Sequence, residues 1–230
     1  MAAVGSVDAH GYMSAPKVEF AIQGDPTQYC ATMDGPKTLT APAGMSFTTD
    51  PLSNTKAFNA AFKASQYKSI KALVEAKATF KPGMSRECGV TSATAAKQPL
   101  PPMVEWSHSA SEGFTPSHEG PCEVWCDNKI VFTDDNCSRN YPMIPAKLPY
   151  KKDQCAGAKM LKIYWLALHS SEWQVYLNCG PLTGGGSGGG GGGSKTPKFT
   201  LECGIYGVNH SMMDSAVYFE KFADLVTERW

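Results

Sequence analysis

The chain has 230 residues, 42% of them hydrophobic, and its 21 basic residues balance its 21 acidic ones. This length allows one sizeable domain, and a balanced charge gives no reason to expect nucleic-acid binding. No stretch approaches the roughly 18 consecutive apolar residues of a membrane helix, so we expect no membrane span. Eight cysteines, an even number, favour disulfide bonds and therefore an exported protein.

The first nine residues, Met1–Ala9, end in Val7-Asp8-Ala9, as a signal peptidase site does. The segment lacks the basic start and apolar core of a whole signal peptide, so we interpret it as the truncated end of one or as the product of a misplaced start codon. Cleavage after Ala9 would make His10 the first residue of the mature protein. A terminal histidine carries an α-amine and an imidazole, which together can chelate a metal. The alternative is a solvated polar residue.

Residues 10–182 are predicted to form one all-β domain, because short apolar runs alternate with Gly, Pro, Ser and Thr as in a β-sandwich. Residues 55–81 differ, since Phe58 and Phe62, and then Ile70, Leu73 and Val74, recur at helical spacing. We expect a helical insertion or a long, partly helical loop there. The predicted strands are 122–126, 130–132, 162–168 and 173–177.

The insertion also carries a local excess of positive charge, because only Glu75 opposes its lysines. Such an excess can steer a polyanion, and the equally weighted alternative is a solvated helix face. The lysines are Lys56, Lys63, Lys68, Lys71, Lys77 and Lys81.

The end of the chain is predicted to be a linker and a tail. Residues 183–194 are mostly glycine, which is typical of a flexible linker. Residues 195–230 include an amphipathic pattern over 215–229 and are too short to fold readily alone. They are interpreted as a tail, a docking element or sequence from a wrong gene model.

Two further segments place histidine in a context that favours metal chemistry. His118 precedes Gly120-Pro121 and a predicted strand, and His169 follows the predicted strand 162–168. In the next strand Gln174 and Tyr176 are two residues apart and so share a face. Each alone has an ordinary structural explanation, whereas their joint occurrence with His10 favours a metal site.

Taken together, these motifs resemble those of the lytic polysaccharide monooxygenases. The residues are His10-Gly11 after a signal site, His118 in His-x-Gly-Pro, and Ala167-Leu168-His169 followed by Gln174-x-Tyr176. The sequence of residues 120–125 and the lysine-rich insertion are most similar to the oomycete, pectin-active branch, auxiliary activity family seventeen. The resemblance extends from His10 to about Cys179.

The resemblance implies an immunoglobulin-like β-sandwich that holds one copper ion on a flat, exposed surface. His10 would supply its amine and one ring nitrogen, His118 a third nitrogen, and Tyr176 the axial position. Gln174 would orient the bound oxygen species, and His169 matches a neighbouring histidine. The implied protein is a secreted, monomeric enzyme that uses an external electron donor to cleave plant polysaccharide oxidatively, with the galacturonan of pectin as the expected substrate.

The resemblance also implies a disulfide between Cys30 and Cys179, and it makes surface aromatic residues such as Tyr12 and Trp173 candidates for contacts with sugar. Cys122 and Cys126 cannot pair with each other, because four residues of a strand span about 13 Å. One of the seven cysteines before the linker must therefore pair with Cys203 or stay free.

Other kinds of site fit the sequence less well. A zinc site at His118, Cys122 and Cys126 is disfavoured, because these thiols should be oxidised in an exported protein. His108 is the nearest rival copper ligand but lacks the Gly-Pro context. The chain has no Gly-x-Ser-x-Gly elbow of a hydrolase. The remaining alternatives are a copper-binding protein with the same ligands but no oxidative activity, and a carbohydrate-binding module without copper.

The copper hypothesis requires a free amine at His10. We therefore expect intact-mass measurement of the secreted protein to show loss of Met1–Ala9. A mature chain that keeps these nine residues would contradict the copper mechanism, because the nitrogen of His10 would then be an amide.

Overall fold

A computed structural model describes residues 11–108 and 113–184, all within the unit formed by residues 1–190. His10, the signal remnant, most of the predicted linker and the whole predicted tail lie outside the described residues. The described strands form two antiparallel sheets. The smaller sheet has the order β1 (Tyr12–Ala15), β4 (Val104–Ser107), β7 (Ala146–Leu148). The larger has the order β3 (Thr79–Phe80), β2 (Ala31–Asp34), β9 (Glu172–Pro181), β8 (Met160–Ala167), β5 (Cys122–Cys126), β6 (Lys129–Asp134).

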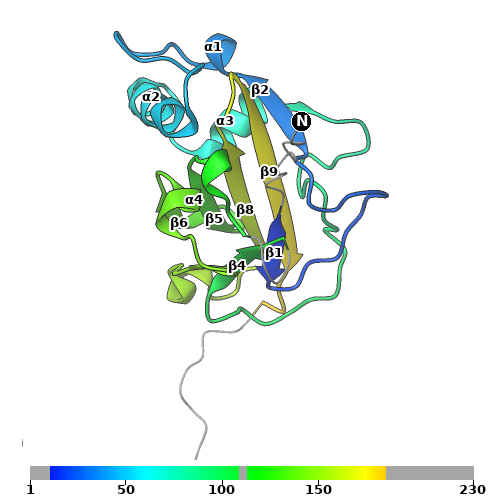
Figure 1. Cartoon of the computed structure of the whole chain (residues 1–230). Coiled ribbons are helices and arrows are strands. Elements are labelled where there is room, and N and C mark those ends of the chain that lie inside the picture. The colour runs from blue at the N-terminus through cyan, green and yellow to red at the C-terminus, as the bar shows by residue number, and fades with distance from the viewer. Residues whose placement is uncertain (1–10, 109–112, 185–230) are drawn as a thin grey trace, which may run out of the picture. The chain divides into compact units, whose positions relative to one another are not determined.

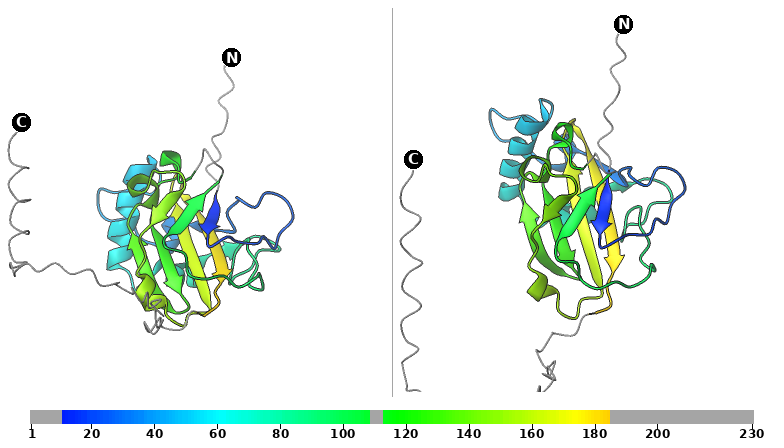
Figure 2. Two further views of the ribbon diagram at one scale, coloured as in Figure 1. Left: turned by 90° about the horizontal axis from the view of Figure 1, so that it is seen from below. Right: turned by 60° about the horizontal axis from the view of Figure 1, so that its bottom comes forward.

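The smaller sheet packs on one face of the larger sheet, and helices α2 and α3 cover part of the other face (Figures 1 and 2). Trp106 of β4 meets Trp165 of β8 in the first layer of core, and Phe58 of α2 meets Trp173 of β9 in the second. The helices are α1 (Gly35–Thr38), α2 (Pro51–Ala64), α3 (Ile70–Lys77) and α4 (Cys137–Asn140), with short 3-10 helices η1 (Pro116–His118) and η2 (Lys152–Cys155).

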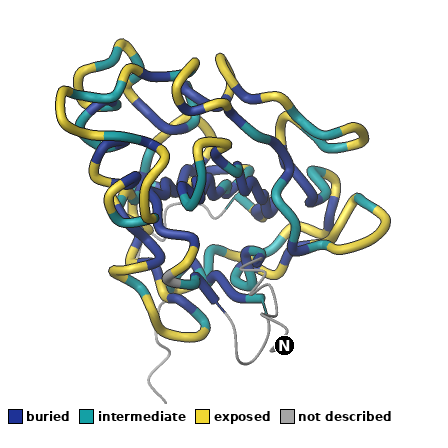
Figure 3. The backbone as a smooth tube through the Cα atoms, turned by 45° about the horizontal axis from the view of Figure 1, so that its top comes forward, coloured by how far each residue is buried: buried dark blue, intermediate teal, exposed yellow. Residues whose placement is uncertain are grey.

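Strand β8 is buried on both faces over most of its length, and Figure 3 shows buried backbone running through the middle of the molecule. Its residues alternate between the two layers, so that Ile163 and Trp165 belong to the first core and Tyr164 and Leu166 to the second. A strand buried on both faces reads as a continuous apolar run, which explains why 162–168 shows no alternation of polar residues.

The predicted β-rich fold with two sheets and the predicted strands are confirmed, and the predicted helical insertion consists of two helices. Helix α2 begins at Pro51, before the predicted segment, because Asp50 caps it by accepting a hydrogen bond from the amide of Ser53. Helix α3 begins at Ile70, capped in the same way by Ser69.

Helix α3 is attached to the sheet through Glu123, a carboxylate on β5 that is only 3% exposed. It accepts hydrogen bonds from the backbone amides of Ile70 (2.7 Å) and Lys71 (3.2 Å) and from the indole of Trp125 (2.9 Å). Burial raises the pKa of Glu123. Amides in the first turn of a helix have no acceptor within the helix itself. In α3 two of them donate to the carboxylate of Glu123 on the sheet.

The disulfide pairing differs from the expected one. Cys179 bonds to Cys88 and not to Cys30, which corrects the Cys30–Cys179 pair implied by the resemblance. Cys30 is a buried free thiol beside β9, and its sulfur donates to the carbonyl oxygen of Val175 at 3.3 Å. The other two bonds are Cys122–Cys137 and Cys126–Cys155, so Cys122 and Cys126 do find separate partners as predicted.

Trp173 cannot contact sugar, contrary to expectation, because its side chain is fully buried between Phe47 and Phe58. Tyr12 remains half-buried at the edge strand β1, packed edge-on against Phe20 at 5.2 Å. Within residues 11–108 and 113–184 no helix is long and apolar enough to cross a membrane.

The thiol of Cys30 is expected not to react with alkylating reagents in the folded protein. Its burial raises the pKa to about 12, so almost no thiolate exists at neutral pH. Peptide mapping after alkylation should find Cys30 labelled only when the protein is unfolded first. Labelling of native protein at Cys30, or a Cys30–Cys179 peptide in a non-reducing digest, would contradict the structure.

Candidate metal centre

His118 is placed by a backbone connection between the segment before β5 and the end of β8. The amide of Leu168 donates to the carbonyl of Glu119 (2.9 Å), and that of Leu166 donates to the carbonyl of Pro121 (3.0 Å). Gly120 lies between them with φ of 156°, where a Cβ would be 2.0 Å from the carbonyl oxygen of Leu166. Only glycine fits there, which explains the glycine of the His-x-Gly-Pro motif.

This connection brings His118 and His169 together, although 51 positions separate them in the sequence. Their ring centroids are 4.2 Å apart with an interplanar angle of 34°. The hydroxyl of Ser117 lies 3.0 Å from Nδ1 of His118, the kind of contact that fixes a histidine ring and directs Nε2 toward a metal.

His169 has the properties of a neutral, half-buried ring. Burial lowers its pKa, so the uncharged form is favoured at neutral pH. Its Nδ1 is buried and has no hydrogen-bond partner within the described part of the chain. A buried ring nitrogen without a partner is uncommon and is one of the signs of an incomplete polar site.

Tyr176 and Gln174 lie on the same face of β9, as predicted. The hydroxyl of Tyr176 donates to Oε1 of Gln174 at 2.9 Å, whereas Val175 between them faces the second core. The ring of Tyr176 is 1% exposed and stacks on Trp165 at 4.5 Å. Trp165 in turn lies 6.4 Å from the ring of His118, so the same indole neighbours both the tyrosine and the histidine.

His10 lies outside the described residues, but the next residue is held firmly. The amide of Gly11 donates to the carbonyl of Thr27 (3.1 Å), and a Cβ on Gly11 would be 2.4 Å from the indole nitrogen of Trp106. Trp106 packs edge-on against Tyr176 at 6.1 Å. The described chain therefore begins beside the aromatic cluster that also contains Tyr176.

In the folded protein His108 lies close to the start of the described chain, which its sequence context did not indicate. Tyr12 pairs with Ser107 in the antiparallel ladder of β1 and β4, so His108 comes opposite Gly11. His108 therefore remains a rival to His118 as a ligand. The zinc alternative is wrong, because Cys122 and Cys126 are both in disulfide bonds.

A buried asparagine that the sequence analysis did not single out positions the end of β8. Asn54 of α2 donates from Nδ2 to the carbonyl of Leu168 (2.8 Å) and accepts from the amide of Thr49 (2.8 Å). Its position was detectable, since Asn54, Phe58 and Ala61 share one helical face. It thereby holds the residue that precedes His169.

Among the residues that the structure describes, no group of three or more His, Cys, Asp or Glu side chains is placed to hold a metal ion. A metal site at this place therefore needs at least one ligand from outside the described residues. The amine and the ring of His10 are the ligands predicted from there. Comparisons with protein-family models and with curated proteins find no match for this chain.

Replacing Asn54 should disturb the end of β8. Asn54→Ala leaves the carbonyl of Leu168 and the amide of Thr49 without their partner, at an expected cost of about 1–3 kcal/mol in the free energy of unfolding. Denaturant unfolding measures this cost, and NMR titration should show a changed pKa of His169.

The matched control is Asn59→Ala on the same helix, which loses a solvent-exposed hydrogen bond to the carbonyl of Asp135. It should change stability by less than about 0.5 kcal/mol. Equal effects of the two substitutions would show that Asn54 has no special role.

Proposed function

We propose that this protein is a secreted, copper-dependent lytic polysaccharide monooxygenase with an immunoglobulin-like domain, acting on the galacturonan of pectin. The observation that carries the proposal is the meeting of two distant segments at one end of the large sheet. The segment before β5 contributes His118, and the β8–β9 hairpin contributes His169, Gln174 and Tyr176. The three disulfides of the domain support export.

Nitrogen ligands from His10 and His118 suit copper chemically. Copper held there would supply, with an external reductant, the activation of dioxygen or hydrogen peroxide needed to oxidise a C–H bond beside a glycosidic linkage. The protein's task is to hold the ligands in place. Ser117 fixes the ring of His118, and Gly120 allows the backbone of that segment to reach β8.

Gln174 is arranged to donate hydrogen bonds. Its Oε1 accepts from the hydroxyl of Tyr176, and its amide N–H groups make no hydrogen bond to the residues that the structure describes, so they can orient an oxygen-containing ligand. Tyr176 is fixed by Trp165 and keeps its hydroxyl on this amide. His169, kept uncharged by burial, can approach a cationic centre without repulsion.

The distribution of lysine supports an anionic polymer. Four lysines of the insertion are exposed: Lys56, Lys63, Lys68 and Lys77. A fifth, Lys81, places its ammonium 3.4 Å from the ring centroid of Tyr29, which packs edge-on against Tyr176 at 6.3 Å. Tyr29 is therefore the one ring between the ammonium of Lys81 and Tyr176 of the candidate centre. A uronate chain that lies across the centre would meet positive charge there.

The test loads the cleaved protein with copper, adds ascorbate and de-esterified pectin, and measures oxidised oligosaccharides by mass spectrometry. Loss of a residue that only supports a metal ligand typically lowers metal affinity by about 10–100-fold. His118→Ala removes a proposed ligand itself, so its copper affinity should fall by more than that. Gln174→Leu should keep copper affinity and lower product formation by about 10–100-fold.

His108→Ala is the matched control, and it should keep both copper affinity and activity. If His108→Ala loses copper and His118→Ala keeps it, then His108 is the copper ligand and His118 is not. If the copper-loaded protein forms no oxidised product on pectin, cellulose, chitin or xylan, the enzyme proposal fails and a copper-binding protein with the same ligands stands in its place.

A further inference from the structure

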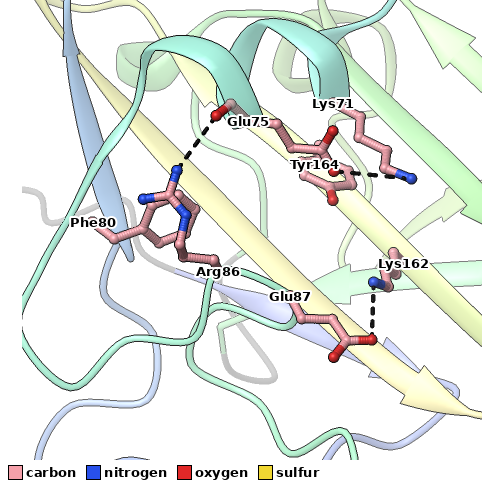
Figure 4. Close-up of a pocket in the computed structure, with 7 residues that line it drawn as sticks. All are labelled: Lys71, Glu75, Phe80, Arg86, Glu87, Lys162 and Tyr164. Atoms are coloured by element: carbon pink, nitrogen blue, oxygen red, sulfur yellow. Dashed lines mark hydrogen bonds and ion pairs between the residues drawn. The ribbon is translucent and has the colours of Figure 1, made fainter.

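A pocket of about 330 Å³ opens on the helix-covered face of the large sheet (Figure 4). Its floor is Tyr164 of β8, and α3, the end of β3, the loop that follows β3 and the start of β8 form its walls. Tyr164 is five residues from His169, or roughly 16 Å of extended chain. The pocket is therefore separate from the candidate metal centre.

Two lysines of the pocket are sunken and weakly paired. The side chains of Lys71 and Lys162 are 17% and 13% exposed. Their nearest carboxylate oxygens, on Glu75 and Glu87, are 4.0 Å and 3.4 Å away. A strong ammonium–carboxylate hydrogen bond is nearer to about 2.8 Å, and each ammonium has three donors. Both lysines therefore have capacity for a further anionic ligand.

The two carboxylates, in contrast, can leave the lysines easily. Glu75 and Glu87 have side chains 57% and 63% exposed. Exposed ion pairs of this kind contribute little, so an incoming carboxylate can displace them toward solvent at small cost. Together with Arg86 the pocket has three cations against two carboxylates, and it keeps a positive balance.

Arg86 and Tyr164 add directional donors. The guanidinium of Arg86 lies over the ring of Phe80, 4.9 Å from its centroid, and donates to the carbonyl of Glu75 at 3.4 Å. These contacts fix a planar group that is suited to bind a carboxylate in a bidentate manner. The hydroxyl of Tyr164 makes no hydrogen bond within residues 11–108 and 113–184, so the floor offers a further polar group suited to a ligand hydroxyl.

We propose that this pocket binds one carboxylated sugar unit, a hexuronate, apart from the metal centre. The volume lies at the small end of ligand pockets and suits a single sugar unit. The carboxylate follows from the three cations, and the choice of a sugar rests on the proposed function. A polymer that engages both sites would be held more tightly than either site alone holds it.

Lys71 is placed in this pocket by the sheet itself. Its backbone amide is one of the donors to Glu123, and its ammonium lies 4.8 Å from the ring centroid of Trp125 and 3.4 Å from Oδ1 of Asn128. The backbone of Lys71 is therefore held against the sheet before any ligand arrives, which favours binding.

The test measures binding to copper-free protein by calorimetry and by amide NMR, so that it does not depend on oxidation. The probes are trigalacturonate, its neutral counterpart galactotriose, and succinate as a carboxylate without sugar. Trigalacturonate should bind and shift the amides around Tyr164 and Lys162. Lys162→Met should weaken this binding about 10-fold or more, because one charge-assisted hydrogen bond is lost.

Glu87→Gln should strengthen binding several-fold, because it removes the competitor of the ligand for Lys162. A gain of affinity cannot come from loss of the fold. Lys147→Met, at an exposed position of β7 in the smaller sheet and outside the pocket, should leave binding unchanged. The control for folding is the melting temperature of each variant.

The proposal is overturned if trigalacturonate does not shift the amides around Tyr164, if Lys162→Met leaves its affinity unchanged, or if Glu87→Gln weakens it. Equal binding of galactotriose would overturn the role of the carboxylate, and equal binding of succinate would overturn the choice of a sugar. A protein that binds trigalacturonate here but oxidises nothing would refute the proposed function and leave this pocket intact.

Discussion

Strand β8 is the element on which the rest of the structure depends, because it is buried on both faces. Trp165 faces the small sheet, whereas Tyr164 and Leu166 face the helices. Burial of side chains of this size stabilises the fold by about 1.5–3 kcal/mol each. The same strand accommodates Gly120 at its end and forms the floor of the charged pocket near its middle, so the candidate metal centre and the pocket share one rigid support.

The strands and the helical insertion could be predicted from sequence because their signals are local. The run at 162–168 is apolar on both faces. Gln174 and Tyr176 can be placed on one face of their strand, because residues two apart in a strand point to the same side. The approach of His118 to His169 could be anticipated only from motifs, since the hydrogen bond between Leu168 and Glu119 that produces it is not visible in either segment alone.

Other features could not be predicted, since they depend on contacts between distant segments. Cysteine spacing does not determine connectivity, and the partner of Cys179 proved to be Cys88. Trp173 was expected at the surface, yet it shares the face of β9 that carries Val175 and is buried against Phe58 of α2 and Phe47 of the preceding loop. The pocket of Lys71 and Lys162 joins a helix to a strand 91 positions later, beyond the reach of any local pattern.

The Cys88–Cys179 bond has a consequence for how the candidate centre is assembled. The bond closes a covalent ring with a sequence separation of 91, and His118, His169, Gln174 and Tyr176 all lie inside that ring. His10 lies outside it. An unfolded but oxidised chain thus keeps four of the five proposed side chains within one loop of restricted entropy, while the histidine at the mature terminus must be recruited from a free end. Maturation at that end and oxidation of the ring are two separate covalent events, and the proposed copper site requires the first whatever the state of the second.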